Sequence, residues 1–588
     1  MIYMKFYQKI SFLFSPAQKR ELKILAVLIL IGMFFEMLGL GIMIPALTLM
    51  LKTDLVKEYP SLQPFLKAIG NPTQSELVFY GMSLLVFVYV TKAIYMVYLS
   101  WRQNHFSSLL SAELADRLFL GYLRQPYIFH IQRNSSELLQ NIQHEVNVFN
   151  VITVSSITII AELSMAISVA TMLIIIEPVG AISVILFIGV FATIFSKLTQ
   201  KKLLIWGNGR QFHLTLLTKN LIQGISGVKD VKISGRENYF LGEFQKHNLA
   251  QARINTRVHT LATTPRLYLE LLAAIGLAAL ISIMILQSRP LHLLVPTLGV
   301  FAAAAFRLIP SLNRIMTSLQ SVRYSQPVID LLYKELTEIN DYENSVLANG
   351  KIELKSKIQI DKLVFSYPMS NTNVLKNVSL TIEKGESVGF IGPSGSGKSS
   401  LVDLILGLLK PVSGVILVDG HDIQQNLRQW QNKLGYVPQS IYLTDDTLRR
   451  NVAFGIKDSE INDELVNRAI KAAQLEEFIE NTRLGLDTVV GERGVRLSGG
   501  QRQRIGIARA LYHDPEVLVF DEATSALDSD TEKNVVETIK SLQGDKTILV
   551  IAHRLSTIKY CDRVFKVDNG HMTEIDLNEL LLDNTIKS

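Results

Sequence analysis

The chain has 588 residues, which is too long for a single hydrophobic core, so two or more domains are expected. Its mean hydropathy of +0.25 is high for a soluble protein of this size, and the apolar excess lies in the first half. The net charge of +6 does not indicate a nucleic-acid-binding protein, because cytoplasmic loops of membrane proteins also collect Lys and Arg. The single cysteine, Cys561, excludes an internal disulfide.

Six apolar segments in the first half are long enough to cross a membrane as helices, since about 20 residues span ~30 Å of hydrocarbon. They cover residues 24–50, 77–101, 149–176, 179–195, 267–287 and 291–309. The sequence therefore predicts an all-α transmembrane domain of six helices over residues 1–320.

The distribution of basic residues predicts how this domain is oriented. Residues 197–266 carry twelve Lys or Arg, and residues 102–143 carry four. By the positive-inside rule both loops are cytoplasmic, and so are both termini. Residues 55–69, in an external loop, show apolar residues at helical spacing, which predicts a short helix at the outer membrane surface.

Several charged residues lie within or at the ends of the apolar segments, where charge is costly and often functional. They are Glu36, Lys92, Arg266, Glu270 and Arg307. One interpretation is that Lys92, Arg266 and Arg307 line a cavity for an anionic headgroup such as a pyrophosphate. The alternative is that these charges pair with one another or extend toward the interface.

The apolar density falls after Arg314. Residues 321–350 include the end of the last helix and a charged linker, and residues 351–588 form a soluble domain. Short β-type runs alternate there with helical patterns, which predicts an α/β fold with a largely parallel sheet.

A glycine-rich loop stands between an apolar run and a helical run in this second domain, and it fits the phosphate-binding pattern G-x-x-x-x-G-K-[ST]. Its backbone N–H groups and the following helix N-terminus are expected to bind ATP phosphates. Lys398 would reach the β and γ phosphates, and Ser399 would help to hold Mg²⁺. The predicted nucleotide-binding residues are Gly392, Pro393, Ser394, Gly395, Ser396, Gly397, Lys398, Ser399 and Ser400.

Two carboxylates end an apolar run about 120 residues further on, in Val517-Leu-Val-Phe-Asp521-Glu522. Asp521 suits Mg²⁺, directly or through water, and Glu522 could orient or deprotonate the attacking water. Together with the glycine-rich loop, this pattern predicts a site that binds a nucleoside triphosphate and Mg²⁺.

The pentapeptide Leu497-Ser498-Gly499-Gly500-Gln501 opens a helix and resembles the signature of ATP-binding cassette (ABC) ATPases. The resemblance implies that Ser498, Gly499, Gly500 and Gln501 contact nucleotide. It also implies the roles of four further elements. Tyr367 would stack on the adenine, and Gln439 would act at the catalytic centre and bind Mg²⁺. Residues Ser525–Asp528 would form the D-loop, and His553 would be the catalytic switch histidine.

The chain has one phosphate loop and one signature, so it resembles an ABC exporter half-transporter. In that family the phosphate loop of one copy and the signature of another close over the same ATP. A domain-swapped homodimer is therefore implied, and residues 123–139 and 224–235 resemble the two coupling regions of exporters.

The membrane domain resembles the bacterial lipid-linked oligosaccharide flippases of protein N-glycosylation, in residues 265–270 and 306–315 and in the external segment. The implied cargo is a polyprenyl-pyrophosphate glycan, moved to the outer leaflet of a bacterial inner membrane. Exporters of other lipids, drugs, peptides or proteins use the same ATPase and remain the alternative. A regulator that only binds ATP is disfavoured by the pair Glu522 and His553.

Overall fold

The structure of the protein is a computed structural model. It describes residues 6–51, 73–176, 178–286, 291–343, 352–368, 370, 372–522, 529–552 and 554–576. The chain divides into two compact units. We call them the helical unit, residues 1–125 and 132–345, and the α/β unit, residues 126–131 and 346–588. The external segment 55–69 lies outside the described residues.

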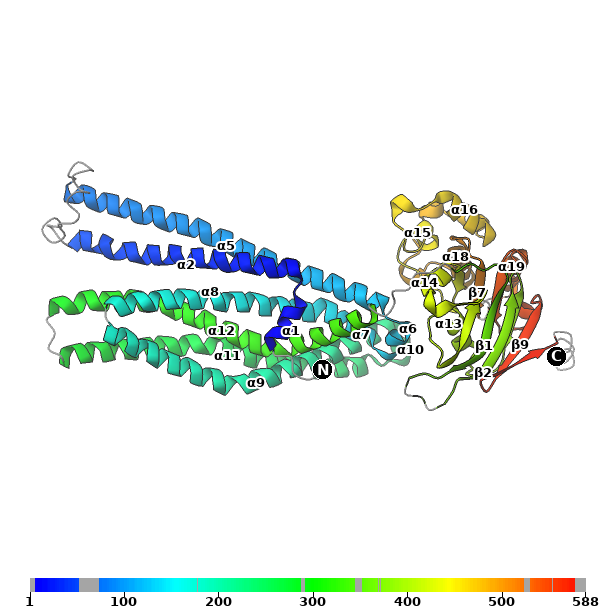
Figure 1. The fold of residues 1–588 in the computed structure, drawn as a ribbon, viewed down its shortest axis with the longest axis horizontal. Helices are drawn as coiled ribbons and strands as arrows, with labels where there is room; N and C mark the ends of the chain where they lie inside the picture. Colours follow the sequence, from blue (N-terminus) through cyan, green and yellow to red (C-terminus); the bar gives the residue numbers. More distant parts are fainter. Residues whose placement is uncertain are drawn as a thin grey trace. The chain divides into compact units, whose positions relative to one another are not determined.

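Helices make up the helical unit, and the long ones lie side by side (Figure 1). The helices are α1 (Phe6–Leu13), α2 (Pro16–Leu51), α5 (Gln74–Arg124), α7 (Ser135–Gln140), a π-helix η2 (Asn141–Glu145), α8 (Val146–Ile176), α9 (Pro178–Ser226), α10 (Val228–Ser234), α11 (Glu237–Leu286) and α12 (Leu291–Glu343). At 1.5 Å per residue, α5 alone is about 75 Å long, so it extends well beyond ~30 Å of hydrocarbon.

Each of the six apolar segments lies in one of the long helices α2, α5, α8, α9, α11 and α12, apart from residue 287, which is not described. Within the described residues, three stretches are long and apolar enough to cross a membrane by length and composition. They are Pro16–Gly39, Ser75–Arg124 and Ser135–Thr171. Large apolar side chains such as Phe87 and Val97 are exposed along α5, as expected for a surface that faces lipid.

The long helices pack side by side, with α12 against α8, α9 and α11, and α2 against α5 (Figure 1). α9 approaches the backbone of α12 closely at Gly207, where a Cβ atom would lie 2.1 Å from the carbonyl oxygen of Tyr324. Any side chain larger than hydrogen would separate the two helices here. Gly207 therefore fixes the distance between α9 and α12 at this level.

The α/β unit contains two sheets. The larger has the order β10-β9-β3-β8-β7-β6, and its strands are parallel except for β10. The smaller is antiparallel, with the order β2-β1-β4-β5. The strands are β1 (Lys357–Phe365), β2 (Leu375–Glu383), β3 (Ser387–Ile391), β4 (Ser413–Val418), β5 (His421–Asp422), β6 (Leu434–Val437), β7 (Val517–Asp521), β8 (Thr547–Ile551), β9 (Arg563–Asp568) and β10 (His571–Ile575). The predicted α/β fold with a largely parallel sheet is confirmed.

Short helices complete the α/β unit (Figure 1). They are α13 (Lys398–Ile405), η3 (Ile423–Gln425), α14 (Leu427–Gln431), α15 (Leu448–Val452), η4 (Asp458–Glu460), α16 (Asp463–Ala472), α17 (Glu476–Glu480), η5 (Gly485–Asp487), η6 (Glu492–Gly494), α18 (Gly499–Leu511), α19 (Ser529–Ser541) and α20 (Leu555–Ile558). Of these helices, α15 and α16 stand apart from the strands (Figure 1). The buried residues of β7 are all apolar, and those of β8 are apolar after Thr547, which is typical of parallel strands covered on both faces.

The short helix α6 (Tyr127–Gln132) belongs almost entirely to the α/β unit, although its neighbours in sequence belong to the helical unit. Ile128 packs against the hydrophobic core that includes Phe390 and Trp430. α6 is thus packed into the α/β unit through apolar contacts.

Candidate functional site

The glycine-rich loop follows β3 and ends at the N-cap of α13, the strand–loop–helix arrangement that its sequence predicts. Two of its glycines are required by space and by backbone conformation. Gly392 has φ of 147°, and a Cβ there would lie 2.1 Å from the carbonyl oxygen of Val567. Gly397 has φ of 108°, and its Cβ would lie 2.9 Å from Leu375 Cδ2. The loop can therefore adopt its tight curve only with glycine at these positions.

Lys398 lies over this loop. Its Nζ donates to the carbonyl oxygens of Gly392 at 2.8 Å and Pro393 at 3.0 Å. Burial lowers the pKa of Lys398, while the charges of Glu522 and Asp521 oppose this effect. A buried ammonium group held above a glycine-rich loop is suited to bind phosphate oxygens. Ser396 Oγ is also buried and has no hydrogen-bond partner, so this hydroxyl can donate to a phosphate.

Asp521 and Glu522 stand at the carboxyl end of β7, beside the loop that follows β3. This proximity follows from the sheet, because β3, β8, β7 and β6 are consecutive parallel strands whose carboxyl ends share one edge. Tyr436 Oη donates to Asp521 Oδ2 at 3.3 Å. Gln439, two residues after β6, donates from Nε2 to Glu522 Oε2 at 2.6 Å. The structure thus brings Lys398, Gln439 and both carboxylates to one edge.

The backbone of Glu522 is unusual for a side-chain-bearing residue. Its φ is 48°, in the left-handed region, and its N–H donates to the carbonyl oxygen of Ile551 at 3.0 Å. Such strain is frequently found at functional sites. Burial and the neighbouring Glu522 charge raise the pKa of Asp521.

Tyr367 reaches the same region from the loop after β1. Its hydroxyl lies 3.0 Å from Ser400 Oγ, and its ring meets Phe365 edge-on with centroids 5.0 Å apart. Ser400 is on α13, one residue after Ser399, so Tyr367 is connected to the phosphate loop. The side chain of Ser399 is exposed, as are Ser394 and Gly395.

The signature residues form the start of α18. Ser498 is the N-cap, and its Oγ accepts from the N–H of Gln501 at 3.2 Å while Gln501 Oε1 accepts from the N–H of Ser498 at 2.8 Å. This capping box fixes the helix start and leaves Ser498 and Gly499 exposed. No hydrogen bond or ion pair among the described residues joins Ser498–Gln501 to the phosphate loop. Within the described residues, the signature therefore has no direct polar contact with Lys398.

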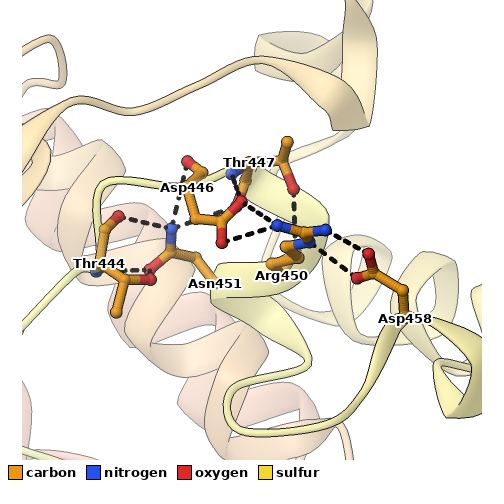
Figure 2. A network of polar contacts seen from close by, with 6 residues as sticks. All are labelled: Thr444, Asp446, Thr447, Arg450, Asn451 and Asp458. Carbon is orange, nitrogen blue, oxygen red and sulfur yellow. Dashed lines mark hydrogen bonds and ion pairs between the residues drawn. The ribbon is translucent and has the colours of Figure 1, made fainter. Parts of the chain in front are cut away.

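The segment that follows Gln439 contains a network of polar contacts, shown in Figure 2. Its members are Thr444, Asp446, Thr447, Arg450, Asn451 and Asp458. The fully buried Asn451 accepts from the N–H of Thr444 at 3.0 Å and donates to its carbonyl oxygen at 3.0 Å. Arg509, on α18, donates to the carbonyl oxygens of Asn451 at 2.9 Å and Tyr442 at 2.8 Å. Arg509 thus connects α18 to the segment that follows Gln439.

Two predicted elements of this site, Ser525–Asp528 and His553, lie outside the described residues. Two other residues were missed by the sequence analysis. Tyr436 precedes Gln439 by three residues on a buried strand. Asp403 lies one helical turn after Ser399, and burial together with the Asp521 charge raises its pKa to about 6. The i,i+4 spacing from Ser399 was the signal that could have identified Asp403.

In the helical unit, two of the predicted substrate residues are paired with carboxylates. Lys92 Nζ lies 2.8 Å from Glu36 Oε1, and Arg266 Nε lies 2.8 Å from Glu270 Oε1. The side chain of Arg307 is outside the described part of the structure.

Glu162 was not singled out from the sequence although it lies within an apolar segment. Its Oε1 is 2.7 Å from Arg314 Nε, and its Oε2 accepts from Ser311 Oγ at 2.7 Å. The structure therefore adds a further paired charge, between α8 and α12.

Comparisons with known proteins agree with this geometry. A family model described as "ABC transporter" matches residues 375–525. The chain is 30% identical over 509 residues to an "ATP-dependent lipid A-core flippase" of Dechloromonas aromatica, with 84% of each chain covered. It is 42% identical over 253 residues to a "Putative multidrug export ATP-binding/permease protein" of Staphylococcus aureus, with 43% of each chain covered.

A bacterial Atm1-family ABC exporter, solved with ATP bound, shares the fold. Its TM-score is 0.74 at 22% identity, and the superposition covers 97% of this chain and 98% of that chain. The long-helix unit and the phosphate-loop α/β unit define an ATP-dependent membrane transporter. The chain belongs to the ABC transporter family, as an exporter half-transporter, and the resemblance found in Leu497–Gln501 is confirmed.

Proposed function

We propose that two copies of this chain form a homodimer that hydrolyses ATP and moves a lipid-linked glycan across a bacterial inner membrane. The observation that carries the ATPase part is the meeting of Lys398, Gln439, Asp521 and Glu522 at one edge of the sheet. The exposed signature supports the dimer, since Ser498 and Gly499 are free to contact ATP held by a second copy.

Mg²⁺ fits the donors at this edge. Ser399, Gln439 and Asp521 offer hydroxyl, amide and carboxylate oxygens, which are the ligands that Mg²⁺ prefers. Bound there, the ion would neutralise charge on the β and γ phosphates. Lys398 would bind those phosphates, and Glu522 would accept a proton from the attacking water or orient it. Tyr367 would stack on adenine, and His553 would contact the γ phosphate.

The domain arrangement belongs to this proposal. Residues 1–320 would form the membrane domain, residues 321–350 the linker, and residues 351–588 the ATPase domain, with both termini in the cytoplasm. Motion at the ATP site would reach the membrane domain through the coupling regions 123–139 and 224–235. The packing of Ile128 on α6 into the core of the α/β unit supports the first of these.

The similarity to ATP-dependent lipid A-core flippases over 84% of the chain supports a lipid cargo. We propose the finer identity, a polyprenyl-pyrophosphate glycan, from the matches in residues 265–270 and 306–315. Lys92, Arg266 and Arg307 would bind its anionic headgroup, which requires Lys92 and Arg266 to exchange Glu36 and Glu270 for phosphate oxygens. A drug exporter is the second candidate, because 43% of the chain is 42% identical to a putative multidrug exporter.

Reconstitution into liposomes tests the proposal. We expect polyprenyl-pyrophosphate glycans to stimulate ATP hydrolysis and to appear on the opposite leaflet, while drugs and peptides do neither. The double variant Arg266→Ala, Arg307→Ala should lose transport and keep basal ATPase activity, and Lys398→Ala should lose productive ATP binding. Stimulation by drugs but not by glycans would favour the second candidate.

A further inference from the structure

A cavity of about 240 Å³ lies between α9 and α12 in the helical unit. Its walls toward the apolar segments are formed by Ala192, Phe195, Leu312 and Ile315. Beyond this apolar part its lining becomes polar, with Ser196, Gln320 and Arg323. The cavity is thus amphipathic along the direction of the two helices.

The position of the cavity follows from the helix packing. Further along both helices, Gly207 holds α9 directly against the backbone of α12 at Tyr324. The cavity occupies the stretch before this contact, where larger side chains keep the helices apart. It coincides with the end of the apolar segment 179–195, where the charged residues of α9 begin with Lys197. This is the depth at which lipid headgroups meet a spanning helix.

The polar end of the cavity has hydrogen-bonding capacity that the protein does not use. Arg323 Nη1 donates to the carbonyl oxygen of Ser196 at 2.7 Å, but no carboxylate of the described residues pairs with this guanidinium. Gln320 is only 6% exposed, and its Nε2 has no hydrogen-bond partner. A buried donor without an acceptor is destabilising. Both groups therefore favour an acceptor with negative charge.

We propose that this cavity binds the phosphate of an anionic phospholipid of the inner leaflet, with Arg323 and Gln320 as donors and the first part of one acyl chain against Phe195 and Ile315. The cavity is smaller than the roughly 300–1,000 Å³ of drug-sized ligand sites, so it accommodates a phosphodiester and a short chain segment rather than a glycan headgroup. The occupant is a resident lipid that binds across α9 and α12, not the cargo. The inference rests on the proposed membrane orientation.

Native mass spectrometry of the full-length protein, without nucleotide, tests this site by titration with phosphatidylglycerol or phosphatidylcholine. We expect wild type to bind phosphatidylglycerol at least tenfold more tightly than phosphatidylcholine. Arg323→Gln should remove this preference, because it removes the positive charge. Ala192→Leu, which fills the apolar end without touching the donors, should weaken binding of both lipids.

Lys201→Gln is the matched control, since Lys201 is an exposed basic residue on α9 outside the cavity. It should bind both lipids as wild type does. Equal binding of the two lipids by wild type, or unchanged preference in Arg323→Gln, would overturn the inference. If either result were found and the wild-type protein still transported the lipid-linked glycan, the proposed function would stand without this lipid site. Selective binding in a protein that transports no glycan would support the site and overturn the proposed cargo.

Discussion

The side-chain amide of Gln439 donates to the carboxylate of Glu522, with 2.6 Å between Nε2 and Oε2. This contact joins the segment after β6 to the end of β7 and points the carboxylate along the edge where Lys398 and Asp521 lie. The backbone of Glu522 is in the left-handed region, and its N–H donates a hydrogen bond to the carbonyl oxygen of Ile551. These two features hold the main chain that carries the carboxylate. Glu522 is therefore oriented by contacts within its own chain.

Replacement of Glu522 by Gln should preserve ATP binding and abolish turnover. The amide keeps the size and hydrogen bonds of the side chain but cannot accept a proton, and general-base catalysis typically contributes about 10²–10⁴-fold. We expect steady-state ATP hydrolysis to fall by at least that factor, while ATP affinity changes little and a closed dimer accumulates. Glu537→Gln, an exposed position on α19, is the control. Hydrolysis at the wild-type rate in Glu522→Gln would remove our assignment of this residue.

Tyr436 should act on the reaction through Asp521. Its hydroxyl donates to Asp521 Oδ2 at 3.3 Å and so holds one carboxylate oxygen in place. Tyr436→Phe removes this hydrogen bond, worth about 1 kcal/mol. We expect the Mg²⁺ concentration for half-maximal ATPase activity to rise about fivefold, with a smaller change in kcat at saturating Mg²⁺. A lower kcat with an unchanged Mg²⁺ requirement would indicate a purely structural role.

Much of the ATP site could be predicted from the sequence because its motifs depend on local geometry. The glycines of the phosphate loop are required by the approach of Val567 and Leu375, and the loop necessarily joins β3 to α13. Parallel strands then bring Asp521 to the same edge. Tyr436 belongs to no motif, and the i,i+4 spacing of Asp403 from Ser399 is too common on helices to be specific, so the place of both residues at the site depends on how β6, β7 and α13 pack.

The partners of the charged residues within the apolar segments, by contrast, could not be predicted from the sequence. Lys92 and Glu36 are 56 residues apart, and only the packing of α2 on α5 determines that they meet. Glu162 has no local signal at all beyond being a charge in an apolar run. Long-range helix pairing cannot be read from composition, so the sequence left pairing and ligand binding open for these residues.

The contact between Arg133 and Glu335 should contribute strongly to the stability of the helical unit. Arg133 Nη1 lies 2.8 Å and 2.7 Å from the two oxygens of Glu335, whose side chain is 2% exposed, and Tyr122 Oη donates to the same carboxylate at 3.0 Å. Removal of one partner leaves a buried charge uncompensated, at a cost of about 3–5 kcal/mol. We expect Arg133→Met to lower the apparent Tm of the detergent-solubilised protein by several degrees.

Two further variants separate charge compensation from simple loss of packing. Glu338 also contacts Arg133, at 2.8 Å, but is 42% exposed, so Glu338→Gln should change the apparent Tm little. Arg133→Lys should recover part of the stability lost in Arg133→Met, because it restores a positive charge beside Glu335. Equal Tm values for wild type and Arg133→Met would show that this buried contact adds no net stability.

His213 and His247 should make the packing of α9 on α11 sensitive to acid. Their Nδ1 atoms lie 3.0 Å apart, so a hydrogen bond between them requires a proton on one Nδ1 and none on the other. Burial of His247, followed by the charges of His213 and Lys246, lowers its pKa, while Glu243 acts in the opposite direction.

Because the unfolded pKa of histidine is about 6.5, the locally open state binds more protons than the packed state below that pH. The free energy of local opening should therefore fall as the pH falls from about 6.5 toward the lower pKa of packed His247. Above about pH 6.5 it should be fully retained. Hydrogen exchange of peptides covering residues 205–221 and 240–255, corrected for intrinsic rates, should show less protection at pH 5.5 than at pH 7.5. His247→Gln should abolish the difference, whereas His259→Gln, an exposed position on α11, should retain it. The same loss of protection in His247→Gln and wild type would assign the acid sensitivity to other groups.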